Sequence, residues 1–149
     1  MGHDIVTDRI TIRQRSRNMS KIKSKNTKLE MIVREYLFSH GLRYRIHYKV
    51  QGRPDIAFPK YKIAIFINGC FWHQHGCRLS VIPKTRTDFW QKKLSANRER
   101  DLKVQGFLTS EDWVVITLWE CDLTTSTTLT LENLGKKIID RIVSLHDSS

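Results

Sequence analysis

The sequence Lys62-Ile-Ala-Ile-Phe-Ile-Asn-Gly-Cys-Phe-Trp-His-Gln-His-Gly-Cys77 joins an apolar run directly to a segment rich in Cys and His. The run from Ile63 to Ile67 has the length of a strand, and its unbroken apolar character is typical of a strand buried on both faces. A second such stretch, Trp-Val-Val-Ile-Thr-Leu-Trp-Glu, covers residues 113–120. We therefore expect two buried strands in one sheet.

Helical patterns and two weaker strands surround these stretches. Thr27 begins a helix with the form of a capping box, Thr27-x-x-Glu30, and Gly41 ends it. Strands are expected within residues 44–50 and 56–58, a charged helix over about 87–105, and a last helix with an apolar stripe from Leu131 to Leu145. This order predicts an α/β fold in which helices flank a central mixed sheet.

Length and composition indicate a single domain with a polar extension. The chain has 149 residues, enough for one hydrophobic core. Residues 1–26 are polar and basic and read as an N-terminal arm, and residues 27–149 form the domain. The chain carries 26 Lys and Arg against 15 Asp and Glu, a net charge of +11. Such an excess favours a polyanionic partner, and nucleic acid is the commonest, although charge alone leaves membranes and acidic proteins open.

The cellular location follows from the cysteine count and the lack of targeting signals. No apolar run is long enough to span a membrane, and the N-terminus lacks the apolar core of a secretory signal. Three cysteines suit a reducing compartment better than a disulfide framework. We expect a cytoplasmic protein that is not associated with membranes; the family resemblance given below implies a bacterial protein that is associated with the nucleoid.

The Cys- and His-rich segment predicts a structural zinc site. Cys70, His75 and Cys77 supply three donors of the kind that tetrahedral zinc prefers. Cys121 follows the second buried strand and completes the set if both strands end at the same edge of the sheet. The alternative is three ordinary buried thiols beside a surface histidine. On spacing alone, His73 and His75 are interchangeable as the fourth ligand.

The segment Gly52-Arg-Pro-Asp-Ile56 gives a weaker signal of nuclease chemistry. Phosphodiester hydrolysis needs a carboxylate that holds magnesium against the phosphate and a group that activates water. Asp55 before a short strand, with a hydrophobic strand to follow, has the outline of a restriction-type nuclease core. Gly-Arg-Pro-Asp is also an ordinary turn sequence, and the usual Asp/Glu-x-Lys is replaced by Phe66-Ile-Asn68.

Several unusual motifs in one order make the resemblance specific. They are Arg15-Ser-Arg-Asn-Met19, Gly-Arg-Pro-Asp, Phe-Ile-Asn-Gly-Cys-Phe-Trp-His, Thr-Arg-Thr-Asp-Phe-Trp, Asn-Arg-Glu-Arg-Asp and Trp-Glu-Cys. Together they resemble the very-short-patch-repair (Vsr) endonuclease family over most of the chain. The resemblance implies a restriction-endonuclease-like core with one structural zinc. It also implies an enzyme that nicks DNA beside the thymine of a T:G mismatch, which arises when 5-methylcytosine deaminates.

The resemblance also implies roles for individual residues. Asp55 matches a metal-binding aspartate, and the backbone carbonyl of Ile67 a second magnesium ligand. His73 matches a histidine in acid–base catalysis, for which imidazole is well suited near neutral pH. Glu30 and Asp101 match acidic residues of the active site. The four zinc ligands are Cys70, His75, Cys77 and Cys121.

Three aromatic residues, Phe71, Trp72 and Trp90, match side chains that wedge into the duplex beside the mismatch. A T:G pair stacks poorly, so intercalation there costs less than at a matched pair. Met19 matches part of an arm in the minor groove. The charge pattern predicts that basic residues of the arm, including Arg15, Arg17, Lys21 and Lys23, follow phosphates.

Some of these residues have a purely structural alternative. Glu30 completes a capping box with Thr27, and Asp101 can pair with basic neighbours on an exposed helix. The three aromatic residues can belong to the core, and basic runs are often only solvated. Asn68 stands where some family members have His. Because an amide cannot accept a proton as imidazole can, this difference affects how water is activated.

We therefore expect a magnesium-dependent, strand-nicking endonuclease specific for T:G mismatches in double-stranded DNA. It should act as a monomer, because one asymmetric mismatch offers no two-fold symmetry, and mismatch-repair proteins are candidate partners. One alternative is a zinc-stabilised DNA-binding module without catalysis. Another is a homing or restriction-type nuclease on the same core that cuts both strands.

Overall fold

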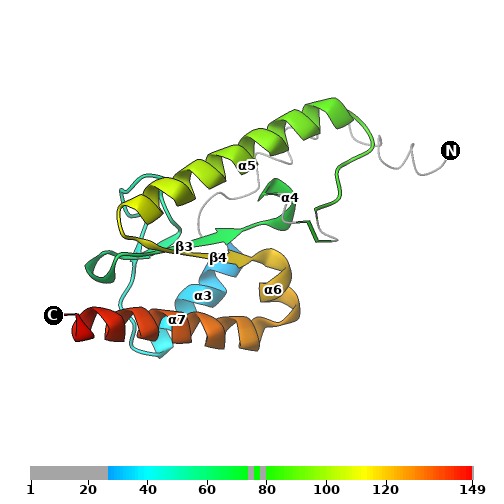
Figure 1. Cartoon of the computed structure of the whole chain (residues 1–149). Helices are drawn as coiled ribbons and strands as arrows, with labels where there is room; N and C mark the ends of the chain where they lie inside the picture. The colour runs from blue at the N-terminus through cyan, green and yellow to red at the C-terminus, as the bar shows by residue number, and fades with distance from the viewer. Residues whose placement is uncertain (1–26, 74–75, 78–79, 149) are drawn as a thin grey trace.

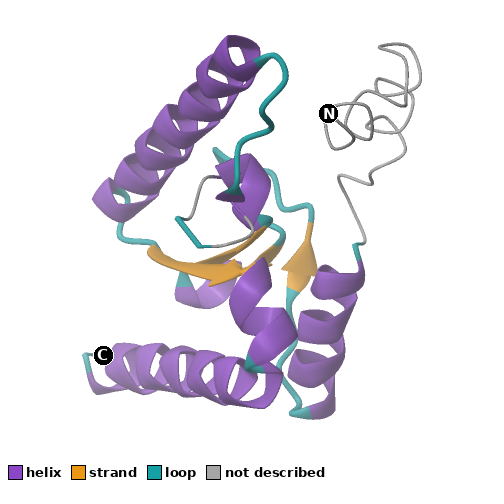
Figure 2. Cartoon of the chain, turned by 90° about the vertical axis from the view of Figure 1, so that its right-hand side faces the viewer, coloured by secondary structure: helices purple, strands orange, loops and turns teal. Residues whose placement is uncertain are grey.

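The computed structural model describes residues 27–73, 76–77 and 80–148, whose elements form three layers (Figures 1 and 2). The sheet lies in the middle. On one side lie the long helix α5 (Thr87–Ser110) and the short α4 (Cys70–His73). On the other side lie α3 (Lys28–Ser39), α6 (Glu120–Thr125) and α7 (Thr127–Asp147). The expected α/β fold with a mixed sheet flanked by helices is confirmed.

The sheet has four strands in sequential order: β1 (Arg45–Ile46), β2 (Ile56–Phe58), β3 (Ile63–Asn68) and β4 (Val114–Trp119). The first three are antiparallel neighbours, and β3 pairs with β4 in parallel. A short 3-10 helix, η1 (Pro59–Tyr61), joins β2 to β3. Asn68 is the register partner of Trp119. The strands β3 and β4 therefore end at the same edge of the sheet, as the zinc prediction required.

The core packs between the sheet and the layer that contains α3 and α7. Residues from these elements and from α6 form the cluster, which comprises Val33, Leu37, Ile56, Phe58, Ile63, Ile65, Ile116, Leu118, Leu123, Leu131, Leu134 and Ile138. Leu94 and Leu108 of α5 are also buried. Strand β3 is buried from Ile63 to Ile65 and only half-buried from Phe66 to Asn68. The C-terminal half of β3 is thus more exposed to solvent than its N-terminal half.

Local differences from the expected elements have identifiable causes. The strand expected within residues 44–50 is only two residues long, because His47 has a φ of 54°, outside the strand region. Helix α5 continues through Gly106 to Ser110, where the fully buried Leu108 anchors its last turn. Helix α3 begins as predicted, with Thr27 Oγ1 accepting the N–H of Glu30 at 3.2 Å. No helix among the described residues is long and apolar enough to cross a bilayer.

Candidate active site and metal centre

A cleft of about 990 Å³ opens where β3 and β4 end, between that sheet edge and α5. Its walls come from the start of α3, the Gly52–Asp55 loop, the ends of β3 and β4, α4 and one side of α5. The predicted catalytic residues Glu30, Asp55, His73 and Asp101 all line it. Glu30 and Asp101, which are 71 positions apart in the sequence, therefore line the same cleft.

Asp55 is the carboxylate at the base of this cleft. Its Oδ2 accepts the backbone N–H of Ile67 at 2.6 Å, which fixes the side chain across the β2–β3 pair. The pKa of Asp55 is raised from 3.8 to about 6: burial is the largest cause and the nearby Glu30 acts in the same direction, whereas the Ile67 N–H, His73 and Arg34 oppose the rise. A carboxylate held in this state gains most from a cation, because a cation offsets the cost of burying its charge. The same hydrogen bond brings the backbone of Ile67 beside Asp55.

Glu30 lies beside Asp55 and is paired with a buried arginine. Its side chain accepts a hydrogen bond from Arg34 at 2.9 Å, and both residues are buried, with exposures of 3% and 7%. The i,i+4 spacing on α3 brings the two together on one helix face. Thr27 caps the helix by accepting the backbone N–H of Glu30, and both residues line the cleft.

His73 and Asp101 form a close pair across the cleft. Nδ1 of His73 lies 2.5 Å from Oδ2 of Asp101, which joins α4 to α5. A carboxylate on Nδ1 orients the ring and leaves Nε2 to exchange a proton with another group. Asn97, one turn earlier on α5, donates its side-chain N–H to the carbonyl of Trp72 at 3.2 Å. These two contacts hold the short helix α4 against α5.

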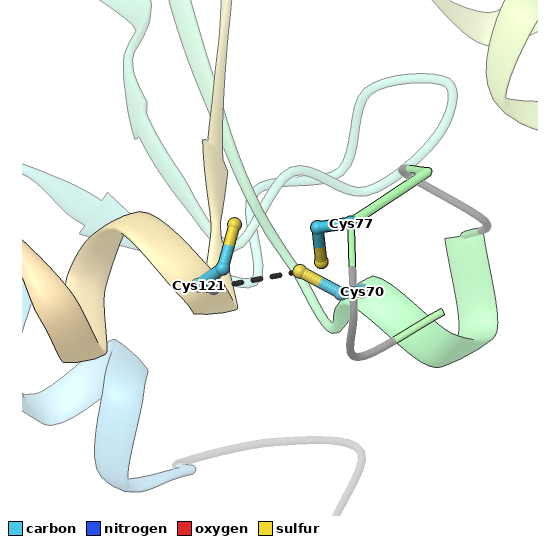
Figure 3. Close-up of side chains that lie close together, drawn as sticks. All are labelled: Cys70, Cys77 and Cys121. Carbon is cyan, nitrogen blue, oxygen red and sulfur yellow. Dashed lines mark hydrogen bonds between the residues drawn. The ribbon is translucent and has the colours of Figure 1, made fainter. Parts of the chain in front are cut away.

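Three cysteine thiols converge at the same edge of the sheet (Figure 3). Cys70 begins α4, Cys77 follows that helix, and Cys121 lies at the start of α6, with all three sulfurs within 4.8 Å of one another. Zinc thiolate bonds of about 2.3 Å place the sulfurs of a tetrahedral site about 3.8 Å apart, so this cluster fits such an ion. The described chain thus contains a candidate three-cysteine metal site, and His75 lies outside the described residues.

Local hydrogen bonds order the thiols. The backbone N–H of Cys121 donates to Sγ of Cys70 at 3.4 Å (Figure 3), and Ser80 Oγ donates to the Cys70 carbonyl at 3.0 Å. Burial, the largest cause, raises the pKa of Cys70 to about 12, and that of Cys121 is also raised. Two neighbouring thiols that resist ionisation without a metal, Cys70 and Cys121, are the expected state of a site whose thiolates are stabilised by a bound cation.

The predicted wedge residues gather around the start of α5. Phe71 and Trp72 are half-buried and line the cleft, and their rings meet edge to face at a centroid distance of 5.0 Å. Trp90 packs against both rings and is only 3% exposed. It therefore occupies a core position, which is the structural alternative to DNA contact stated for it above. Its buried Nε1 has no hydrogen-bond partner among the described residues. In this conformation Trp90 is the buried ring against which Phe71 and Trp72 pack.

Some site residues were not identified from the sequence. Arg34 has a recognisable signal in its i,i+4 spacing to Glu30, and Asn97 lies within a quoted motif, but neither was assigned a role. Glu120, whose Oε1 accepts the N–H of Cys70 at 3.2 Å, links the thiol cluster to the cleft through a contact between residues 50 apart. The predicted DNA contacts Met19, Arg15, Arg17, Lys21 and Lys23 lie outside the described residues.

Comparisons with known proteins identify a family of DNA endonucleases. The family profile of DNA mismatch endonuclease Vsr matches residues 7–79. The chain is 44% identical over 119 residues to the type II nicking enzyme V.XorIIP of Xanthomonas oryzae pv. oryzae, covering 79% of this chain and 88% of the relative. It is 48% identical over 119 residues to V.NmeAIP of Neisseria meningitidis, covering 79% and 85%. Against DNA mismatch endonuclease Vsr of Escherichia coli, identity is 38% over 125 residues, covering 83% and 80%.

The fold, the cleft and these relatives define the class of the protein, which is that of DNA endonucleases. Within that class the match to the profile and to relatives over most of their length is specific. The chain belongs to the family of DNA mismatch endonuclease Vsr.

Proposed function

We propose that this protein nicks one strand of double-stranded DNA beside the thymine of a T:G mismatch that arises from deamination of 5-methylcytosine. The observation that carries the proposal is the cleft that is lined both by a half-buried Asp55 with a raised pKa and by the His73–Asp101 pair. A carboxylate and an oriented imidazole are the two kinds of group that hydrolysis of a phosphodiester requires. Membership of the Vsr family supports DNA as the substrate.

Asp55 holds the catalytic magnesium in this proposal, with the backbone carbonyl of Ile67 as a second ligand and Glu30 nearby. A magnesium ion bound there supplies positive charge that stabilises the phosphate as its charge increases during attack. The raised pKa of Asp55 has a direct consequence: its carboxylate is protonated below about pH 6 when no cation is bound. Magnesium binding and nicking should therefore weaken together as the pH falls through that value.

His73 accepts the proton of the attacking water, and Asp101 positions it. The contact at Nδ1 fixes the ring and stabilises the imidazolium that forms once the proton has moved. Asn68 also lines the cleft, but an amide cannot accept a proton, so it can only orient water by hydrogen bonding. Proton transfer in this protein therefore depends on His73.

The thiol cluster binds structural zinc in this proposal, with His75 as the fourth ligand beside Cys70, Cys77 and Cys121. The three sulfurs, which lie within 4.8 Å of one another beside α4 and α6, support it, because an ion there would fix the orientation of α4. Since His73 ends α4, the zinc site and the catalytic histidine share one short element. Zinc would thus act on catalysis by holding that element in place.

Phe71, Trp72 and Trp90 detect the mismatch by wedging into the duplex. The first two rings already line the cleft, whereas Trp90 has to move out of its buried position. Its buried indole N–H lacks an acceptor among the described residues, and an unsatisfied buried donor destabilises the packed state. The unsatisfied donor lowers the free-energy cost of moving the Trp90 ring out of the protein. The weak stacking of a T:G pair lowers the separate cost of opening the duplex to receive the ring.

The wider organisation is part of the same proposal. Residues 27–149 form a single nuclease domain with a restriction-endonuclease-like core, acting as a monomer. Residues 1–26 form a basic arm that contacts DNA through Met19 and the cations Arg15, Arg17, Lys21 and Lys23. Mismatch-repair proteins are candidate partners.

A nicking assay tests this function. Duplexes with one T:G mismatch in varied methylation-site contexts are incubated with zinc-loaded protein and magnesium, with a matched duplex and the Asp55→Ala variant as controls. Strand-specific nicking beside the thymine that the variant abolishes is the expected result. Cleavage of both strands of matched DNA would replace mismatch repair with a restriction-type activity. Mismatch-selective binding without cleavage in any context would instead indicate a DNA-binding module.

A further inference from the structure

Arg53 combines an unfavourable backbone conformation with a position in the cleft. Its φ is 45°, in the left-handed region that glycine adopts without strain, and it precedes Pro54, which favours an extended residue before it. Five described residues other than glycine have positive φ, namely His47, Arg53, Lys62, Arg86 and Asp112. Among these five, Arg53 alone lines the cleft. A strained residue that persists at such a position is a reason to ask what its side chain does.

The surrounding chain leaves this loop little freedom to relax. Gly52, with a φ of 88°, lies so close to α5 that an added Cβ would be 2.2 Å from Cγ1 of Val104. On the other side Pro54 is fully buried, and Asp55 is tied to Ile67. The backbone of Arg53 is therefore fixed between three anchored neighbours, two residues from the proposed metal ligand.

The Arg53 side chain is exposed where it lines the cleft, and among the described residues no hydrogen bond or ion pair to its guanidinium is found. The nearby acidic groups have other partners: Glu30 with Arg34, and Asp55 with the backbone of Ile67. Arg53 thus brings a positive charge to the cleft that no described carboxylate neutralises.

We propose that Arg53 binds a backbone phosphate of the cleaved strand, next to the phosphate that Asp55 faces. This rests on the proposed function in so far as the cleft takes DNA. A guanidinium can bind two phosphate oxygens at once, so it fixes the position of the strand as well as adding attraction. The left-handed backbone turns the chain so that Arg53 and Asp55 both line the cleft, although a buried proline separates them. Glycine would allow the same turn without strain, but it would lack the charge.

The test compares Arg53→Gly, Arg53→Lys and a matched control, Lys62→Gly. Lys62 also has a left-handed backbone, with a φ of 52°, and a positive charge, but it does not line the cleft. Binding of the zinc-loaded protein to a duplex without magnesium is measured over a range of salt concentrations, and thermal unfolding is measured for each variant.

Arg53→Gly should unfold at the same or a higher temperature and bind DNA about tenfold more weakly, and its log–log salt slope should fall by about one. Arg53→Lys should keep the slope, and Lys62→Gly should leave both slope and affinity near wild type. An unchanged slope for Arg53→Gly, an equal loss for Lys62→Gly, or a lower unfolding temperature for Arg53→Gly would overturn the inference. Because binding is measured without cleavage, a failure of T:G nicking in the wild type would overturn the proposed function alone.

Discussion

Replacing Asp55 by Asn should stabilise the metal-free active site while abolishing its chemistry. Burial raises the pKa of this carboxyl from 3.8 to about 6, so in the folded protein it holds its proton more tightly than in the unfolded chain. Stability therefore falls as the pH rises between these two values, and it stays lower above them. Asparagine carries no charge at any pH, and its Oδ1 can still accept the N–H of Ile67.

The size of the effect follows from the difference in pKa. A difference of about two corresponds to about 3 kcal/mol of unfolding free energy, which is an upper value for a partly exposed group. Asp55→Asn should therefore be more stable than wild type by about 2–3 kcal/mol at pH 8, and by about half as much at pH 5.

Urea unfolding of zinc-loaded protein without magnesium, at both pH values, measures this difference. Asp140→Asn on α7 is the matched control, because Asp140 is exposed on the far side of the sheet, and it should show no such gain. Adding magnesium should then raise the stability of wild type and leave Asp55→Asn unchanged. A variant that is no more stable than wild type at pH 8, or a gain of equal size at both pH values, would refute the assignment of a buried, destabilised carboxylate.

Three further predictions follow from the same geometry. Asp101→Asn should slow nicking by about 10²-fold with little change in DNA binding, because the amide lacks the negative charge that stabilises the imidazolium of His73; single-turnover kinetics and binding titrations would separate the two. Cys121→Ser should reduce the zinc content and lower the unfolding temperature, and a strong chelator should lower the unfolding temperature of wild type by a similar amount. Metal analysis and thermal unfolding test this, and a variant that keeps its zinc but unfolds at a lower temperature would show that Cys121 is not a ligand. Gly52→Ala should destabilise the fold by at least about 1–2 kcal/mol, since its Cβ would overlap Val104 at a positive φ, and adding Val104→Ala should recover part of the loss. Additive effects in that double variant, measured by urea unfolding, would contradict the proposed contact.

Long apolar runs were predicted well because their signal is local. The run from Ile63 to Ile67 and the stretch over residues 113–120 appear as the strands β3 and β4. β3 lies inside the sheet, whereas β4 is the last strand of the described sheet, so only its Ile116 and Leu118 are buried and the expectation of a second fully buried strand was wrong. Thr27 caps α3 as its sequence pattern indicates. Short elements were harder: the expected strand over residues 44–50 is reduced to Arg45–Ile46, and α6 was not foreseen. In such short segments a single positive φ or a tertiary contact outweighs the local preference.

The sequence by itself determined which residues carry the chemistry and the class of fold, because composition, apolar periodicity and unusual motifs are properties of the chain alone. Only the tertiary structure decided how those residues meet. The parallel register that sets Asn68 against Trp119 brings Cys70 and Cys121 together, and α5 brings Asp101 to His73. The tertiary structure also buried Trp90, whereas the pairing of Glu30 with Arg34 follows from their i,i+4 spacing within α3. Pairing between distant segments depends on how whole layers pack, and no short stretch of sequence contains that information.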